Sequence, residues 1–533
     1  MGWGVIEDPK TVFPTGTVLL EDKNDDEEKI FDQGTGLKKR GNIVLQPQPS
    51  DDPNDPLNWS RAWKLSHLFV IAFGSSVTNA MTTMVTPGLE PLIEKFNTDE
   101  ATVSSLIITA PTFWTSIAAL VVVSGADIWG RRPFYVISIL ILAITNLLGY
   151  LAYNFPLLVA ARTVAGVFSA PLFTLVTATI ADVFFVHQRG MAISVWNLSL
   201  NAGGQLGQII AGYITDVFGI SAVFAFTAMV FAALVPASYF LVLESAYFNR
   251  APPRGPRSVE TTSITSEDNE DFKAGINLPA KGSYREQLAL FRGRMTDKGF
   301  WISTIKPLGL ISCPIVAYSA LLNSLFLVLL AGGSTVIAVI LGAPPYNLTP
   351  SQIGLTNLPL FGAAIIGGPI AGWMSDASVR FMARTNGTRR GVAEPEFRLV
   401  LLILTTPISA VGLVGTGVSV DKGLPLVWVL IWLSLVSLGS VAGIQITISY
   451  IVDCLPNHSA QAFSSLNMIA ALVVFAGIAP LIGWLDASGP LVVFGSLGSA
   501  CVVIALLAIP FYVLGKKIRG WYGRAEWAQR LLH

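Results

Sequence analysis

The chain has 533 residues, of which 52% are hydrophobic and only 13% charged, and its 34 basic side chains balance its 34 acidic ones. The charged fraction is about half that of a soluble protein, and a net charge of zero provides no basic field for nucleic acid. The three cysteines, Cys313, Cys454 and Cys501, fit no metal-ligand spacing and no disulfide framework. The composition therefore predicts a membrane protein with no metal, no cofactor and no nucleic-acid partner.

Apolar runs long enough to cross a bilayer recur along the chain. A hydrocarbon core about 30 Å thick requires about 20 residues of helix, whereas the strands of a membrane β-barrel need only about ten. Twelve windows reach the helical length: 64–87, 102–125, 133–153, 157–181, 190–213, 220–243, 307–341, 353–375, 398–418, 424–450, 460–484 and 490–514. We therefore expect an all-α membrane protein with twelve transmembrane helices, although the window at 307–341 is too long to place its helix ends.

One long polar break divides these helices into six and six. It covers 245–305, is rich in proline, serine and charge at its start, and is typical of a disordered linker. Within it, Tyr284–Phe300 mixes apolar and basic residues and is expected to form a short helix on the membrane surface. The predicted order is a tail at 1–62, a six-helix bundle at 63–244, the linker, a second bundle at 306–515 and a tail at 516–533.

Positive charges indicate the orientation, because loops rich in lysine and arginine stay in the cytoplasm. They follow the even-numbered helices, as with Arg131 and Arg132 after the second helix and Arg380 and Arg384 after the eighth. The first 60 residues contain no apolar signal-peptide core. Both termini and the linker are therefore expected on the cytoplasmic side of an integral membrane protein.

A charged link, Asp127-Ile-Trp-Gly-Arg-Arg-Pro, separates the second and third helices. Glycine allows a tight reversal, an aspartate can accept hydrogen bonds from a helix N-terminus, and arginines pair with carboxylates and anionic lipid. The link resembles the Gly-x-x-x-Asp-x-x-Gly-Arg-(Arg/Lys) pattern of major facilitator transporters, with Asp127, Gly130, Arg131 and Arg132 matching and Val123 in place of the first glycine. The resemblance implies a gate that locks the cytoplasmic side in one state. The alternative is an ordinary charged turn.

The two halves repeat acidic residues in corresponding places. Asp182 and His187 follow the fourth helix as Asp453 and His458 follow the tenth, and Asp376 ends the eighth helix as Asp127 ends the second. Two such coincidences within a six-plus-six layout indicate a duplicated transporter with its site between the halves. Asp376 is therefore added to the predicted gate.

The fourth helix carries Arg162 within its apolar run. An arginine in the membrane costs several kcal/mol unless it is paired or hydrated, so a polar partner is expected. The spacing Leu157-x4-Arg162-x3-Gly166 resembles the helix-4 motif of the same superfamily, which implies a role for Arg162 in proton coupling. The alternative is an arginine that snorkels to the outer interface.

The fifth helix contains a glycine-rich stretch from Gly203 to Gly212. It resembles the antiporter motif Gly-Pro-x-x-Gly-Pro-x-x-Gly-Gly, with Gly204 and Gln208 at the positions of the two prolines, so the proline kink is absent. Because small residues let helices approach closely, a role in packing alone is an equal alternative.

Further resemblances extend over most of the chain. The segment Asp51–Ser60 before the first helix, Leu243-Glu244-Ser-Ala-Tyr247 after the sixth and Glu394-Pro-Glu396-Phe-Arg398 before the ninth look like elements of the fungal drug:proton antiporter-like members with twelve helices.

Carboxamides supply most of the polarity within the helices, and the carboxylates lie near helix ends. A polycation or metal substrate would need carboxylates at the membrane midplane, so a neutral or weakly polar organic molecule is expected, bound beside aromatic and aliphatic residues. The candidate cavity residues are Asn79, Asn197, Asn201, Gln205, Gln208, Asn323, Asn357, Gln445 and Asn467.

These observations predict a secondary active transporter, not an enzyme. We expect a monomer in the plasma membrane, in contact with lipid, that exports a xenobiotic or secondary metabolite by alternating access with proton coupling. No Gly-x4-Gly-Lys-(Ser/Thr) loop is present, which argues against transport driven by ATP. The alternatives are an uptake permease or uniporter and, in a different class, a non-transporting membrane sensor.

Overall fold

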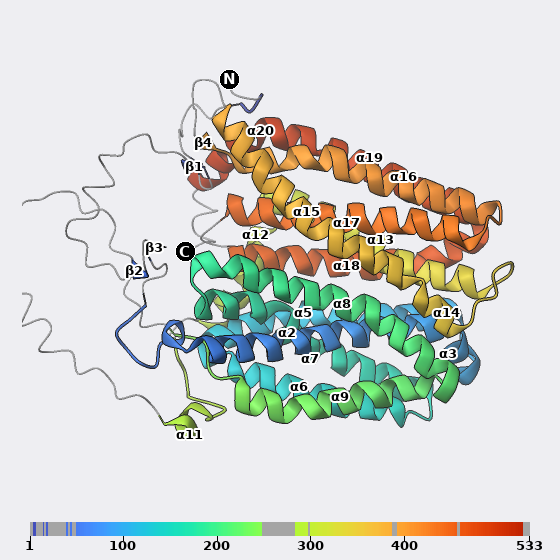
Figure 1. Cartoon of the computed structure of the whole chain (residues 1–533), viewed down its shortest axis with the longest axis horizontal. Coiled ribbons are helices and arrows are strands. Elements are labelled where there is room, and N and C mark those ends of the chain that lie inside the picture. Colours follow the sequence, from blue (N-terminus) through green and yellow to red (C-terminus); the bar gives the residue numbers. More distant parts are fainter. Residues whose placement is uncertain are drawn as a thin grey trace, which may run out of the picture.

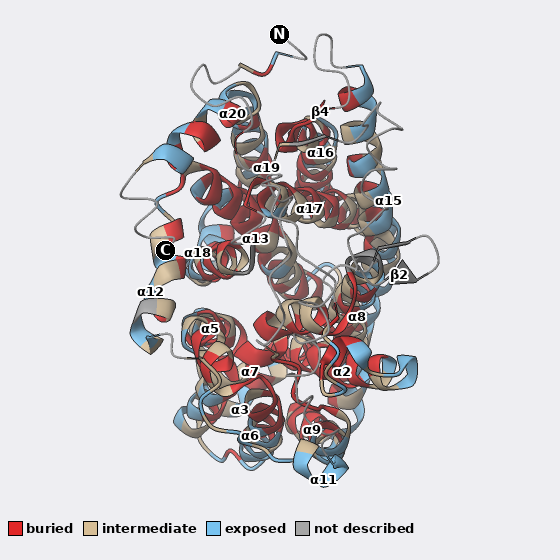
Figure 2. Cartoon of the chain, turned by 90° about the vertical axis from the view of Figure 1, so that its left-hand side faces the viewer, coloured by how far each residue is buried: buried red, intermediate tan, exposed pale blue. Residues whose placement is uncertain are grey.

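The computed structural model describes residues 4–6, 14, 17–19, 39–40, 43–44, 49–247, 283–296, 299–385, 392–455 and 459–525. Long helices run side by side along the molecule (Figure 1). Viewed end-on, they form two groups, with α2 and α5–α9 in one and α13 and α15–α19 in the other (Figure 2). We refer to these groups as the N-half and the C-half.

The N-half begins after a short 3-10 turn, η1 (Pro56–Asn58). Its helices are α2 (Arg61–Thr83), α3 (Leu89–Phe96), α4 (Glu100–Val103), α5 (Ala110–Trp129), α6 (Arg132–Tyr150), α7 (Phe155–Val183), α8 (Val186–Phe218) and α9 (Ile220–Leu241). A 3-10 turn, η2 (Thr86–Gly88), leads into α3, and a π-helical turn, η3 (Ser104–Thr109), joins α4 to α5. Polar caps set several starts: the side chains of Ser60 and Asn154 accept the N–H groups of Trp63 and Leu157.

The C-half repeats this plan. Its elements are α12 (Phe300–Leu310), α13 (Pro314–Gly342), α14 (Pro350–Leu355), α15 (Asn357–Arg384), the 3-10 helix η5 (Pro395–Leu401), α16 (Leu402–Asp421), α17 (Leu426–Cys454), α18 (Ser459–Ser488), α19 (Pro490–Leu506) and α20 (Ala508–Arg524). The over-long window at 307–341 is thus two helices, which separate just before Pro314. Where a surface helix was expected over Tyr284–Phe300, the chain forms one turn, α11 (Tyr284–Gln287).

In the described residues, the strands are four short ones of two residues each. β1 (Val18–Leu19) pairs antiparallel with β4 (Val392–Ala393), and β2 (Lys39–Arg40) pairs with β3 (Ile43–Val44). Most of the linker, including 248–282, lies outside the described residues, so the predicted linker has a structure to compare only at its two ends.

Within the described residues, eleven helical stretches are long and apolar enough to cross a membrane, and α8 is not among them. With 33 residues α8 is nevertheless longer than a span requires, and its lower hydropathy arises from polar side chains such as Asn197, Asn201, Gln205 and Gln208. Counting α8, six membrane helices lie in each half. This confirms the prediction of an all-α integral membrane protein with twelve helices in two bundles.

The two halves pack by the same scheme. In the N-half α2 packs on α8, α5 on α7 and α6 on α9, and the equivalent C-half pairs are α13 with α18, α15 with α17 and α16 with α19. Between the halves, α8 contacts α14 and α15 while α5 contacts α18, which is again a symmetric pair of contacts. The internal repeat seen in the sequence is therefore a repeat of packing.

The halves approach most closely at one end of the bundle. We name this the far end, which carries α3 and α14, and the opposite one the tail end, which carries α11 and α20 (Figure 1). At the far end a Cβ added to Gly212 would collide with the backbone oxygen of Pro350, and one added to Gly354 would lie 2.7 Å from the backbone oxygen of Gln208. The glycines allow α8 and α14 to meet backbone to backbone.

Two hydrogen bonds also join the halves on this side of the molecule. The Asp216 carboxylate accepts the Ser351 N–H at 3.1 Å, and the Asn357 side chain donates to Gln208 Oε1 at 3.2 Å. Opening the far end requires that both bonds break and that α8 and α14 separate.

Because Gly212 lies against a backbone atom, Gly212→Ala is expected to prevent this closure. A cysteine pair placed across α8 and α14 in a fully active background should crosslink in the parent protein and at least tenfold more slowly in the Gly212→Ala variant. Gly372→Ala is the matched control, because no atom lies within 4 Å of a Cβ at that position. Equal crosslinking in all three proteins would show that the Gly212 contact does not hold the far end closed.

Candidate functional site

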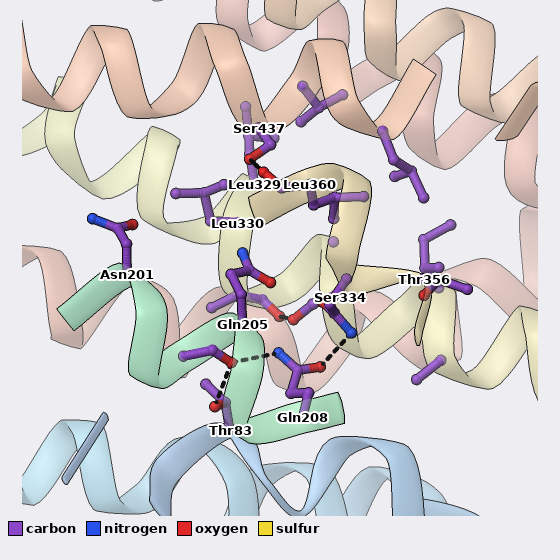
Figure 3. Close-up of a pocket in the computed structure, with 18 of the residues that line it drawn as sticks. Thr83, Asn201, Gln205, Gln208, Leu329, Leu330, Ser334, Thr356, Leu360 and Ser437 are labelled. Carbon is purple, nitrogen blue, oxygen red and sulfur yellow. Dashed lines mark hydrogen bonds between the residues drawn. The ribbon is translucent and has the colours of Figure 1, made fainter. Parts of the chain in front are cut away.

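A cavity of about 220 Å³ lies between the halves, lined by α2 and α8 on one side and by α13, α14, α15 and α17 on the other (Figure 3). Its polar lining residues are Asn79, Thr83, Asn201, Gln205, Gln208, Ser334, Thr356, Asn357 and Ser437. Its remaining lining consists of aliphatic residues and glycines: Gly204, Leu327, Leu329, Leu330, Ala331, Gly333, Ile337, Ala338, Ile353, Leu360, Leu433 and Val436. Most of the polar carboxamides come from the N-half and all of the leucines come from the C-half.

Two N-half side chains of the lining also tie α2 to α8. Asn79 donates to the backbone oxygen of Leu200 at 2.7 Å, and Thr83 donates to that of Gly204 at 3.0 Å. Gly204 permits this approach because a Cβ there would lie 2.8 Å from the Asn79 side-chain nitrogen. The polar wall is therefore fixed in position by the packing of its own helices.

Gln205 is the carboxamide of this wall that is not committed to the protein. Its side chain extends from α8 toward Leu330 and Leu360 of the C-half (Figure 3), and its buried Oε1 accepts no hydrogen bond. An unpaired buried acceptor costs about 1–3 kcal/mol, which a ligand that donates a hydrogen bond would recover. Gln208, one turn on, already bonds Asn357 and the backbone oxygen of Gly204.

The cavity lining contains no ionisable and no aromatic side chain. The absence of charge agrees with the expectation of a neutral cargo, whereas the expected aromatic contacts are missing from this lining. The C-half side is mostly aliphatic and imposes shape rather than directional bonds, although Ser334, Thr356, Asn357 and Ser437 add polar groups to it.

Five of the nine carboxamides proposed from the sequence line this cavity, namely Asn79, Asn201, Gln205, Gln208 and Asn357. The other four, Asn197, Asn323, Gln445 and Asn467, are not among its lining residues. Asn323 is buried, and its side-chain oxygen has no hydrogen-bond partner. The hydroxyls of Ser334, Thr356 and Ser437 were not foreseen, because in an apolar helix a hydroxyl ordinarily bonds a backbone carbonyl nearby, as Ser334 does with Ala331.

At the tail end, the link after α5 turns at Gly130, whose φ is +88°. A Cβ there would also collide with the Glu244 carboxylate, so two independent constraints require glycine. Glu244 accepts the N–H groups of Arg131 and Arg132 at 2.9 and 3.2 Å and thereby caps the start of α6. We expected Asp127 to accept hydrogen bonds from a helix N-terminus, and at the start of α6 the carboxylate that accepts these two N–H groups is Glu244.

The two arginines of the link are buried and have different partners. Arg131 forms an ion pair with Asp182 at the end of α7, with 2.6 Å between Nη1 and Oδ2. Arg132 donates to the backbone oxygens of Tyr239 at 2.8 Å and of Gln287 at 2.6 Å, so it binds α9 and the linker end. The link thus joins the tail-end termini of four N-half helices.

The C-half has the equivalent network around Arg398 in η5. This guanidinium binds Asp376 of α15 at 2.8 Å and Asp453 of α17 at 2.6 Å. Asp376 and Asp453 are the residues that the sequence paired with Asp127 and Asp182. Arg398 was noticed only as part of a family resemblance, although its place before the ninth helix matches that of Arg131 before the third.

Arg162 is buried in the N-half, and its described hydrogen bonds all go to backbone carbonyls. They lie at 2.9 Å to Ile107, 2.9 Å to Met81 and 3.4 Å to Thr82. Met81 and Thr82 are in the last turn of α2, whose carbonyls lack helical partners, and Ile107 is in the π-helical turn η3. Arg162 therefore caps a helix C-terminus and braces the far ends of α2, α5 and α7.

The sequence model of the Major Facilitator Superfamily matches residues 69–477. The chain belongs to the Major Facilitator Superfamily. The predicted relationship is confirmed, and the chain is a secondary transporter of this type that acts on a small molecule.

Curated relatives of this major facilitator are fungal. An uncharacterized MFS-type transporter of Schizosaccharomyces pombe is 23% identical, covering 95% of this chain and 92% of that protein. Protein HOL1 of Saccharomyces cerevisiae is 24% identical, covering 96% of each. The MFS-type transporter hepF of Aspergillus oryzae is 23% identical, covering 92% of this chain and 95% of that protein.

Solved structures share the fold of this transporter. The peptide transporter POT in complex with sulfate has a TM-score of 0.59 at 16% identity and covers 93% of this chain and 99% of that one. The human organic anion transporter MFSD10 (TETRAN) has a TM-score of 0.52 at 14% identity and covers 84% and 99%. At these identities the likeness concerns the fold alone.

Arg162→Met is expected to destabilise the transporter, because backbone carbonyls in a buried site lose their donors. The free energy of unfolding is expected to fall by roughly 2–4 kcal/mol, measured as a lower thermal midpoint in detergent. Arg162→Lys should have an intermediate effect, because an ammonium group cannot reproduce the planar set of N–H donors of the guanidinium. Arg380→Met, at an exposed arginine, is the control. A stable Arg162→Met protein that loses only the pH dependence of transport would instead assign Arg162 to proton coupling.

Gln205→Leu is expected to weaken cargo binding about tenfold, because it removes the uncommitted carboxamide while keeping the side chain's size. The measurement is ligand-induced thermal stabilisation across a set of uncharged organic compounds. Asn197→Leu on the same helix, outside the cavity lining, is the matched control. If both variants respond to ligands as the parent does, Gln205 does not contact the cargo.

Proposed function

We propose that this major facilitator exports a small, uncharged organic molecule, a xenobiotic or a secondary metabolite, by alternating access. The observation that supports this most directly is the cavity between the halves, which has a carboxamide-rich wall, a mostly aliphatic wall with a few polar side chains and no ionisable group. A charged cargo would lose its hydration on entering the cavity without gaining an opposite charge from the lining, which is unfavourable. A neutral molecule with one polar edge suits both walls.

The two ends of the bundle have different roles in this cycle. The far end holds the halves together through the Gln208–Asn357 and Asp216–Ser351 hydrogen bonds. The tail end contains a pair of corresponding ion-pair networks, around Arg131 in the N-half and Arg398 in the C-half. These networks keep each half rigid, so the halves rock as bodies and the far-end bonds break and re-form.

The tail end is proposed to face the cytoplasm, because basic side chains gather there. With that orientation both termini are cytoplasmic, and a plasma-membrane location would make the far end extracellular. We propose that the transporter acts as a monomer surrounded by lipid.

Proton coupling remains a prediction from the resemblance of Arg162 to the helix-4 motif. The cavity lining offers no side chain that titrates near neutral pH, so a coupled proton must be carried by groups outside that lining. The same observation favours the alternative of a uniporter, in which the cargo gradient alone drives the exchange between states.

Flux through proteoliposomes tests the proposal. We expect saturable transport of at least one uncharged organic solute. Its rate should rise when protons move down their gradient in the opposite direction, as in an antiporter. Arg131→Ala should reduce the rate at least tenfold, because the ion pair with Asp182 is lost, whereas Arg380→Ala should leave it unchanged.

A flux that does not depend on the pH gradient would identify a uniporter. Undiminished flux in Arg131→Ala would refute the gate role, and no flux with any solute, together with partner binding by the linker, would support a sensor.

A further inference from the structure

The N-terminal segment lies on the C-half although the next long described stretch of chain lies on the N-half. We define this segment as the described residues Gly4–Ile6, Pro14 and Thr17–Leu19. Downstream, Tyr247 at the end of the N-half donates a hydrogen bond to Asp52 at 3.0 Å. The region before α2 is therefore attached at two places, one on each half.

Backbone bonds attach the segment at two points of the C-half. The Ile6 N–H donates to the backbone oxygen of Val513 at 2.9 Å, and Val5 is buried against Met382 and Phe397. Further along, β1 adds to β4 as an antiparallel strand, with Val18 opposite Ala393 and Leu19 opposite Val392. Such strand addition is a general mode of peptide recognition.

A buried ion cluster lies beside this strand pair. Glu394 binds Lys516 and, at 2.9 Å, Arg519, and Arg519 also binds Glu396 at 2.7 Å. All four charged side chains are at least 96% buried. With two carboxylates and two cations the cluster is neutral, and it joins η5 to α20.

Thr17 contributes the segment's polar contact with this cluster. Its hydroxyl donates to Glu394 Oε2 at 2.8 Å and accepts from Arg519 Nη1 at 3.2 Å. Since the described cluster is already neutral, a negative charge at position 17 would repel the Glu394 carboxylate, compete with it for Arg519 and leave the cluster with a net negative charge.

The same stretch of chain carries the C-half gate network. β4, Glu394 and Glu396 lie directly before or within η5, and Arg398, which holds Asp376 and Asp453, is in the same 3-10 helix. Strand addition at one end of this stretch and the ion cluster in its middle restrict the backbone that positions Arg398. A loss of either restraint frees η5 to move.

We propose that the N-terminal segment is an intramolecular ligand of the C-half, and that its docking through Thr17 and β1 tightens the Arg398 network and so regulates the gate. The regulatory part rests on the proposed transport function, whereas the docking itself does not. The segment acts in cis, by occupying the edge of β4 and completing the ion cluster.

Hydrogen–deuterium exchange of the full-length protein in nanodiscs tests the docking. Removal of residues 2–20 and Thr17→Glu should each accelerate exchange of the 392–401 backbone about tenfold or more, because strand pairing and cluster restraint are lost. Thr17→Val should have a smaller effect, and Thr385→Glu, which adds a charge to an exposed C-half residue, should have none. A synthetic peptide of residues 1–20 should restore slow exchange in the truncated protein, which shows that the variant is folded.

Unchanged exchange over 392–401 after truncation would overturn the proposal. Solute flux provides the second readout: Thr17→Glu should change the maximal rate by at least threefold without changing KM, since the cavity is intact. Accelerated exchange with an unchanged flux would also overturn it, because the docked segment would then not act on the gate. If the parent protein transports no solute, the exchange experiment still decides the docking, so that failure belongs to the proposed function.

Discussion

Polar groups that leave water must find their partners within the protein, and this requirement governs where the charges of this chain lie. Arg162 meets it with backbone carbonyls, which are available because α2 ends and η3 departs from α-helical geometry beside it. Arg131 and Arg398 meet it with aspartates at helix ends. The cavity lining needs no partner for a charge, because its polar groups are amides and hydroxyls.

These paired charges tie the helices of each half together. Each tail-end network ties helices of one half to one another, whereas the far-end contacts join the halves by weak hydrogen bonds and by glycine packing. Interactions within a half are therefore stronger and more numerous than the bonds that cross between halves. The proposed rocking motion requires this difference, because the contacts within each half must stay formed while the contacts between the halves break and re-form.

Much of the fold follows from sequence because its determinants are local. The length of an apolar run gives a helix, so twelve helices were predictable, and the repeat of Asp182 and Asp453 was visible in their matching positions. The site was less so. Asn197 and Gln205 lie on the same helix, yet only Gln205 reaches the cavity lining, because Asn197 lies two turns, about 12 Å, nearer the tail end, and the height at which the halves enclose a cavity is set by packing between them. Arg398, Glu244 and the docked N-terminal segment depend on contacts between residues far apart in the chain, which no single stretch encodes.

In the proposed function, the two walls of the cavity would recognise different properties of the cargo. Carboxamides of α2 and α8 provide most of the hydrogen-bonding groups, and aliphatic side chains of α13, α15 and α17 provide most of the contour. A change such as Leu330→Ala or Val436→Ile would alter the accepted outline without disturbing a single polar contact. A descendant of this gene could thus acquire a new compound of similar polarity through substitutions in one half alone, while the other half and the gating networks were inherited intact.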